Sequence, residues 1–187
     1  MILSRTATGK VLMLEGILTK ESKAMLASLP KPKSVLGKDV PDNLNGITLG
    51  ELFDLQSAVE SQDMHKMVDE FARVLLGVPS GKMWRLRADY GIGFVMWAMR
   101  ELEQIAKMWK SITPPPSPES VQAGVDRLNF GNFGVVDWFA LRMGISDHDK
   151  VLQLPWVRVF ECMRIDNERA TFQERLRDIM TKNIKKR

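Results

Sequence analysis

The stretch Ile47-Thr-Leu-Gly-Glu-Leu-Phe-Asp-Leu-Gln56 contains the strongest helix start in the sequence. Thr48 and Glu51 have the spacing of a capping box, in which each side chain accepts a hydrogen bond from a backbone N–H at the helix start. A helix is therefore predicted over residues 48–60.

Two further helical regions follow it. Residues 63–77 keep apolar side chains at helical spacing and end at a Gly-Val-Pro sequence. A third region covers residues 81–112, and its part from Phe94 to Ile112 is the best candidate for the central helix of a bundle. Within this region, Tyr90-Gly-Ile-Gly93 allows two interpretations, a break in the helix or close packing of another helix against it.

A proline run, Thr113-Pro-Pro-Pro-Ser-Pro118, separates this region from the second half of the chain. Proline fits badly inside a helix but well at its first position. We therefore expect Ser117 to cap a new helix and Pro118 to be its first residue.

Beyond this helix, the glycine-rich residues 129–134 are expected to form a connector and residues 135–143 a helix. Ser146 and Asp149 have the spacing of a second capping box. The last helix is expected from near Pro155 to Asn183, with a kink in its middle.

Residues 1–46 differ from the rest of the chain. A short helix is expected at 19–26, but Pro30, Pro32 and Pro41 exclude regular structure after it, so we interpret this part as an extended arm. Strand signals are almost absent, and the predicted fold class is all-α: a helical bundle in two lobes with an extended proline-rich N-terminal arm. The predicted divisions are an arm at 1–46, a lobe at 47–112, a connector at 113–118 and a lobe with a basic tail at 119–187.

The 187 residues carry a net charge of +4, and this charge is concentrated at the two ends of the chain. Residues 1–46 have a net charge of +3, residues 47–166 of −3 and residues 167–187 of +4. The single cysteine, Cys162, cannot form an internal disulfide, which favours a reducing compartment. We expect no signal peptide. The most apolar stretch, Tyr90–Met99, is shorter than the roughly 20 residues of a membrane span, so no membrane partner is expected.

No group of residues points to catalysis, a cofactor or a metal. Residues 77–82 (GVPSGK) resemble a phosphate-binding loop but have one residue too few between the glycines. Asp147-His148-Asp149 has metal-ligand types, but helix capping explains its carboxylates. Cys162 has no histidine near it in sequence. We therefore expect no catalytic residue, no metal site, no cofactor and a protein that is not an enzyme.

Two sets of residues are candidates for binding a partner. The 12 methionines and five tryptophans are explained most simply by core packing, but they can also line an adaptable binding groove. The groove residues of this hypothesis are Met96, Trp97, Trp109, Trp138 and Trp156. The second set is a basic tail on an amphipathic helix that contains Phe172, Leu176, Ile179 and Met180. The tail residues are Arg175, Arg177, Lys182, Lys185, Lys186 and Arg187.

Over residues 47–180, the pattern of helices resembles that of small helical proteins of tailed bacteriophages. Its first part consists of Ile47–Gln56 and the helix Met67–Val78, which ends in a Gly-Val turn. Its second part consists of Gly134–Gly144, Val151–Val159 and Arg169–Arg175. The nearest named class is the tail assembly chaperones, from which the proline-rich arm at 1–46 departs.

This resemblance implies a non-enzymatic virion-assembly protein that binds other virion proteins, in the host cytoplasm during assembly or in the virion. A homo-oligomer is compatible with it. One alternative is a permanent component of the head, portal or tail, held in place by the N-terminal arm. Another is a helical protein that binds nucleic acid through its basic C-terminus.

Overall fold

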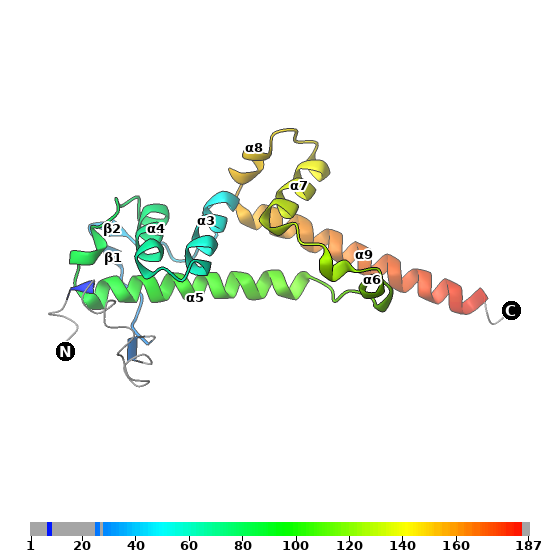
Figure 1. Ribbon diagram of the computed structural model, residues 1–187, viewed down its shortest axis with the longest axis horizontal. Coiled ribbons are helices and arrows are strands. Elements are labelled where there is room, and N and C mark those ends of the chain that lie inside the picture. Colours follow the sequence, from blue (N-terminus) through cyan, green and yellow to red (C-terminus); the bar gives the residue numbers. More distant parts are fainter. Residues whose placement is uncertain (1–6, 9–24, 27, 185–187) are drawn as a thin grey trace. The chain divides into compact units, whose positions relative to one another are not determined.

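The chain is all-α, as predicted, in a computed structural model that describes residues 7–8, 25–26 and 28–184 (Figure 1). It divides into two compact units, residues 1–104 and 105–187, and helix α5 contributes residues to both. The longer elements are α3 (Leu49–Glu60), α4 (Met64–Leu76), α5 (Ala88–Ile112), α7 (Gly131–Met143) and α9 (Trp156–Ile184). The short ones are β1 (Ser34–Val35), β2 (Lys38–Asp39), α6 (Pro118–Gln122), α8 (His148–Leu152) and the 3₁₀ turns Met83–Arg85 and Val125–Arg127.

The capping box at the start of α3 is confirmed. The Thr48 N–H donates to Glu51 Oε2 at 2.8 Å, and the Glu51 N–H donates to Thr48 Oγ1 at 3.2 Å. Helix α4 has a simpler cap, since Asp63 Oδ1 accepts from the N–H of His65 at 2.9 Å. It ends at Gly77, whose left-handed φ of 61° suits glycine. Local hydrogen bonds therefore fix the start of both helices, and a left-handed glycine fixes the end of α4.

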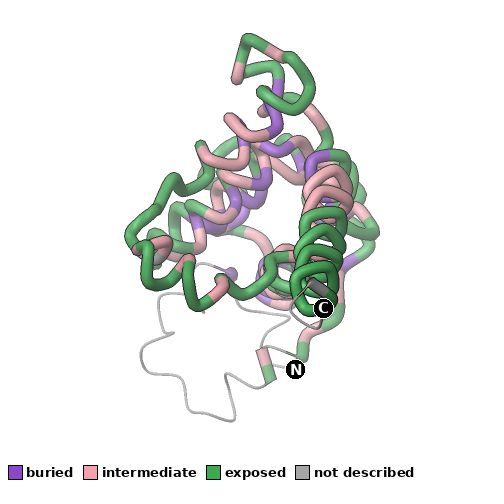
Figure 2. Tube along the Cα trace, turned by 90° about the vertical axis from the view of Figure 1, so that its right-hand side faces the viewer, coloured by how far each residue is buried: buried purple, intermediate pink, exposed green. Residues whose placement is uncertain are grey.

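The core of the first unit consists of apolar side chains from α3, α4 and the first part of α5. Helices α3 and α4 pack against each other. Figure 2 shows buried residues interspersed with exposed ones along the helices, and the helix that leads to the C-terminus is largely exposed. Most of the largest fully buried side chains are aromatic or branched, among them Leu49, Leu52, Phe71, Ile92 and Phe94.

The proline-rich residues 28–46 lie on this unit and contain a small hairpin, which corrects the expectation that this stretch has no regular structure. Strands β1 and β2 pair antiparallel through a turn at Leu36 and Gly37, both of which have positive φ. Val35, Val40 and Leu44 are buried. Of the helix expected at 19–26, residues 19–24 lie outside the described residues.

Helix α5 is continuous through Gly91 and Gly93, so the interpretation of these glycines as a helix break is wrong. Close packing explains them instead, and the two glycines have different partners: Thr8 lies against Gly91, and the non-helical residues 29–32 lie against Gly93. A Cβ on Gly91 would lie 2.1 Å from Thr8 Oγ1, and one on Gly93 would lie 2.7 Å from the carbonyl oxygen of Pro30. The glycines thus let the N-terminal part of the chain approach the helix closely.

The second unit confirms one predicted helix start and corrects two others. Ser117 Oγ accepts from the Ser120 N–H at 3.2 Å and Pro118 is the first residue of α6, as expected. Helix α7 begins at Gly131, inside the stretch expected to be a connector. The cap of α8 is Asp147 rather than Ser146, because Asp147 Oδ1 accepts from the Asp149 N–H at 3.0 Å.

Aromatic packing and polar contacts hold the second unit together. Phe160 of α9 packs edge-on against Trp109 and Trp156, with ring centroids 5.4 and 6.0 Å away. Arg142 of α7 donates from Nε to Asp166 Oδ2 of α9 at 2.8 Å. Helix α9 runs without interruption from Trp156 to Ile184, and its distal part carries the exposed surface described below.

Candidate partner-binding surface

The two groove candidates of the first unit lie in or against its core. Trp97 is only 5 % exposed and packs beside Phe94, with ring centroids 5.9 Å apart. The ammonium group of Lys31 lies over the Trp97 ring, 5.4 Å from its centroid. Met96 is half-buried against a small cluster around Ala88 and Ile92. These contacts give both residues a packing role within the chain.

The three groove candidates of the second unit are also packed. Trp156 is 1 % exposed, Trp109 is half-buried, and both rings contact Phe160. Trp138 is half-buried beside Phe139, with ring centroids 6.0 Å apart. The five candidates divide between two units, and none of them is exposed. Their suggested role in binding a partner stays a prediction.

In the loop 77–82, which resembles a phosphate-binding sequence, the backbone and side-chain donors bind the carboxylate of Asp69. Asp69 of α4 accepts hydrogen bonds from the Gly81 N–H at 2.9 Å, from Trp84 Nε1 at 3.3 Å and from the Ser80 hydroxyl. Burial raises the pKa of Asp69, but these hydrogen bonds and the nearby His65 outweigh it and lower the pKa below its ordinary value. A negative charge thus occupies the place where such a loop would hold a phosphate.

Asp147 and His148, the candidates for metal ligands, cap or pack against helices instead. His148 Nε2 lies 3.4 Å from Asp137 Oδ1, and its ring meets Phe133 edge-on. Asp147 caps α8, as described above. Cys162 is half-buried in α9. Over the described ranges, no three His, Cys, Asp or Glu side chains gather as a set of metal ligands.

The distal half of α9 carries an apolar stripe that is open to solvent. Phe172, Leu176, Ile179 and Met180 are 65, 45, 57 and 58 % exposed. Their spacing places them on one face of the helix. Exposed apolar residues that gather in this way mark interaction sites more often than scattered ones do. We call these four residues the α9 stripe.

Basic side chains accompany the α9 stripe. Arg175, Arg177 and Lys182 are exposed, and none of them has an ion pair with any residue that the structure describes. The other basic tail residues, Lys185, Lys186 and Arg187, lie outside the described residues. The structure therefore places the first half of the predicted tail beside the α9 stripe.

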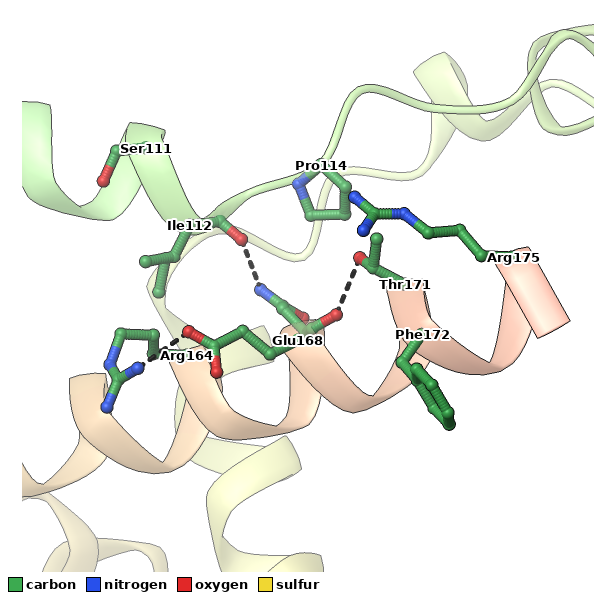
Figure 3. A pocket seen from close by; sticks show the side chains of 9 residues that line it. Ser111, Ile112, Pro114, Arg164, Glu168, Thr171, Phe172 and Arg175 are labelled. Carbon is green, nitrogen blue, oxygen red and sulfur yellow. Dashed lines mark hydrogen bonds and ion pairs between the residues drawn. The ribbon is translucent and has the colours of Figure 1, made fainter.

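A pocket of about 460 Å³ lies on the Arg175 side of α9 (Figure 3). It is lined by the end of α5, Pro114 and one face of α9. Asn167 Nδ2 donates to the carbonyl oxygen of Ile112 at 2.9 Å, and the Thr171 hydroxyl donates to the carbonyl oxygen of Asn167 at 2.8 Å. Figure 3 shows the Arg175 side chain reaching from α9 toward Pro114. Sequence spacing alone gives no sign of this pocket, because its two walls come from distant parts of the second unit.

Of the two arginines that line the pocket, Arg164 forms ion pairs within the chain and Arg175 forms none with the described residues. Arg164 pairs with Glu161 and Glu168, each at 2.7 Å, and these hydrogen bonds raise the pKa of its guanidinium. Arg175 makes no hydrogen bond or ion pair within the described part of the chain. Arg175 is therefore the cation of this pocket that a ligand can reach without competing against an internal carboxylate.

Helix α7 and its N-cap residue Phe130 expose a second set of apolar side chains, which sequence reasoning missed. Phe130, Phe133 and Leu141 are exposed, Leu141 the most at 76 %. The glycines beside the two phenylalanines suggested a connector, and this masked the helical spacing of the three residues.

No helix in the described ranges combines the length and the apolar character needed to cross a membrane. Comparison of the chain with family models, with curated proteins and with solved structures gave no match.

Proposed function

We propose that this chain is a non-enzymatic virion-assembly protein that binds other virion proteins, most like a tail assembly chaperone. The exposed α9 stripe carries this proposal, since four neighbouring apolar side chains on one helix face have no partner among the described residues. The resemblance of residues 47–180 to small helical phage proteins supplies the class of partner. The stripe would cover apolar surface of a virion protein before that surface is assembled.

This role assigns the binding surface to α9 rather than to the methionine and tryptophan set. Trp97 and Trp156 are buried in the cores of the two units, so exposing either side chain to a partner would destabilise its unit. Phe172 and Ile179, in contrast, can be covered by a partner without any rearrangement of the chain. The proposed mechanism is therefore docking on a preformed helix.

Co-purification during phage infection tests the proposal. We would isolate the tagged chain from infected cells and quantify virion proteins by mass spectrometry, for the unchanged chain and for the double variant Phe172→Ser/Ile179→Ser. The proposal expects virion proteins with the unchanged chain and a loss of at least about tenfold with the variant, which corresponds to about 1.4 kcal/mol. Recovery of a monomeric chain with no virion protein would refute it.

A permanent place in the virion is the alternative in which residues 1–46 hold on to neighbouring subunits. Against it, Val35, Val40 and Leu44 are buried in the chain's own first unit and are not free to bind a neighbour. Mass spectrometry of purified particles separates the two roles. An assembly chaperone is absent from finished particles, whereas a permanent component is present in stoichiometric amount.

Nucleic-acid binding is favoured by one observation, the three exposed basic residues of distal α9, Arg175, Arg177 and Lys182. Contacts of basic side chains with phosphates weaken steeply as salt increases. DNA binding measured across a salt series, with and without residues 182–187, tests this alternative. A steep salt dependence that is lost on truncation would support it over protein binding.

A further inference from the structure

The charges around the α9 stripe are unevenly distributed. At about 100° per residue, Arg175 and Lys182 fall beside the stripe on one side and Arg177 lies beyond its other edge. The acids Glu174 and Asp178 fall on the opposite half of the helix. Distal α9 is therefore an apolar stripe with basic flanks.

One acidic residue, Glu168, lies close to the beginning of the stripe, and its carboxylate already forms an ion pair within the chain. Glu168 precedes Phe172 by one turn, and its Oε1 pairs with Arg164 Nη1 at 2.7 Å. From Phe172 to Asn183, no acidic side chain flanks the stripe. A partner that approaches this surface thus meets Arg175 and Lys182, which form no ion pair with any described residue although Asp178 lies within one turn of both.

A second copy of the same helix is a poor occupant of this surface. If two copies pack antiparallel along their stripes, Arg175 of one lies near Lys182 of the other. If they pack parallel, Arg175 lies near Met180. Neither orientation places an acid against the basic flank, and like charges at a helix interface are unfavourable.

The pocket favours a protein over a lipid surface or DNA. It lies on the Arg175 side of the stripe, and its polar lining consists of Ser111, Thr171, the Arg175 guanidinium, Asn167 and the ion pair of Arg164 with Glu168. A protruding side chain with a terminal carboxylate can enter such a hollow and pair with Arg175. A bilayer presents its headgroup carboxylates as a level surface that does not follow a hollow, and DNA offers no apolar face for Phe172 and Ile179.

We propose that distal α9 and the pocket beside it bind an acidic amphipathic helix of a partner protein. The apolar side of that helix covers Phe172, Leu176 and Ile179, and its carboxylates pair with Arg175 and Lys182. This helix-on-helix mode gives affinity through the apolar contacts and orientation through the charges. The inference rests on the proposed function and adds to it the chemistry of the partner.

Two synthetic peptides test the inference with the full chain. Both are about 20 residues long, which allows a helix to form, and both carry the same leucine stripe. One has glutamates on both flanks of its stripe and the other has lysines. Fluorescence anisotropy should show that the glutamate peptide binds at least about tenfold more tightly, with a preference that decreases as salt increases.

Variants of the chain assign the binding to this surface. Arg175→Glu/Lys182→Glu should reverse the preference between the two peptides, and Phe172→Ser/Ile179→Ser should bind each at least about tenfold more weakly. Leu141→Ser is the matched control, because it removes an apolar side chain of similar exposure from α7 and should bind as the unchanged chain does. The reversal compares two peptides on one folded protein, so a general loss of folding cannot imitate it.

Several results would overturn the inference. These are equal affinity for the two peptides, unchanged binding by the Phe172→Ser/Ile179→Ser variant, and tighter binding to phosphatidylserine vesicles or to duplex DNA than to the glutamate peptide. Self-association in sedimentation that depends on Phe172 would point to a second copy instead. If virion proteins co-purify with the chain while the peptides are not distinguished, the proposed function stands and only the acidic helix is refuted.

Discussion

The contact between Thr8 and Gly91 gives a prediction whose sign is opposite to the usual one. Thr8 is fully buried, its N–H donates to the carbonyl oxygen of Leu86 at 2.7 Å, and its hydroxyl lies 3.0 Å from the same oxygen. A methyl group on Gly91 would lie 2.1 Å from Thr8 Oγ1 and 2.8 Å from its Cγ2. Gly91→Ala therefore cannot be accommodated unless Thr8 moves.

The expected free-energy change follows from three contributions. Without a neighbour, alanine in place of glycine inside a helix stabilises by about 1 kcal/mol. Here the added methyl overpacks a closed contact, which costs about 1–3 kcal/mol. Displacement of Thr8 also weakens its hydrogen bonds, each of which contributes about 1 kcal/mol. Gly91→Ala should therefore lower the free energy of unfolding by about 2 kcal/mol.

A double-mutant cycle isolates this contact. In a Thr8→Gly background the clashing atoms are absent, so Gly91→Ala should stabilise the chain by about 1 kcal/mol, as in an open helix. The two effects differ by about 3 kcal/mol, a large coupling energy for one pair of residues. Urea unfolding followed by far-UV circular dichroism measures all four proteins.

If Gly91→Ala stabilises the chain by the same amount with Thr8 and with Gly at position 8, no close contact exists between the two residues. The N-terminal segment would then not lie on α5, and Gly91 would need another explanation.

Three further substitutions test the first unit. Asp69→Ala removes three hydrogen bonds that favour the ionised carboxylate and should cost about 2 kcal/mol at pH 7. Because the pKa of Asp69 in the folded chain lies below its ordinary value of 3.8, its stabilising effect is complete above that pH and is lost as the pH falls through the folded-state pKa. Urea unfolding at a series of pH values should thus show the difference between the chain and the variant shrinking in acid, and a constant difference would contradict it. Thr48→Ala removes the cap of α3 and should cost about 1 kcal/mol in the same assay, whereas an unchanged midpoint would exclude the capping box. Leu44→Ala should cost about 2–4 kcal/mol if residues 28–46 belong to the core, and a cost below about 0.5 kcal/mol would show that they do not.

The helix starts that sequence predicts correctly depend on contacts within one turn. The capping residues Thr48 and Ser117 interact with residues at most three positions away, so sequence spacing alone identifies these two helix starts. Sequence spacing predicts the cap of α8 one residue too early, at Ser146, because Ser146 and Asp147 are both good capping residues. Backbone geometry, rather than residue type, decides between such neighbours.

The features that sequence could not predict depend on distant residues. The role of Gly91 requires Thr8, and the role of Gly93 requires Pro30. The turn of the hairpin puts Leu36 at a φ of 51°, a conformation that leucine seldom adopts and that no local pattern would suggest. In each case the packing of a remote segment overrides the local preference.

The candidate surface was predicted only in part, for a similar reason. Residue type shows that Trp97 and Phe172 are apolar, but only the fold shows that Trp97 is buried and Phe172 exposed. The amphipathic spacing of residues 172–180 predicted a helix with one apolar face. The pocket beside Arg175 was not predictable, because Pro114 and Thr171 come together only in the folded second unit.

The two basic ends of the chain differ in what they can offer a partner. Of the Val and Leu side chains in residues 28–46, only Leu36 is exposed. Lys31 of this segment is bound internally, since its ammonium group donates to the carbonyl oxygen of Pro41 and to Asp42, each at 2.9 Å. Distal α9, in contrast, presents exposed apolar side chains together with basic groups that have no internal partner in the described chain. Specific binding between proteins needs both an apolar contact and charges that orient it. The two ends are therefore similar in charge but differ in the binding groups that they expose. Substitutions in the C-terminal helix should alter binding without altering the fold.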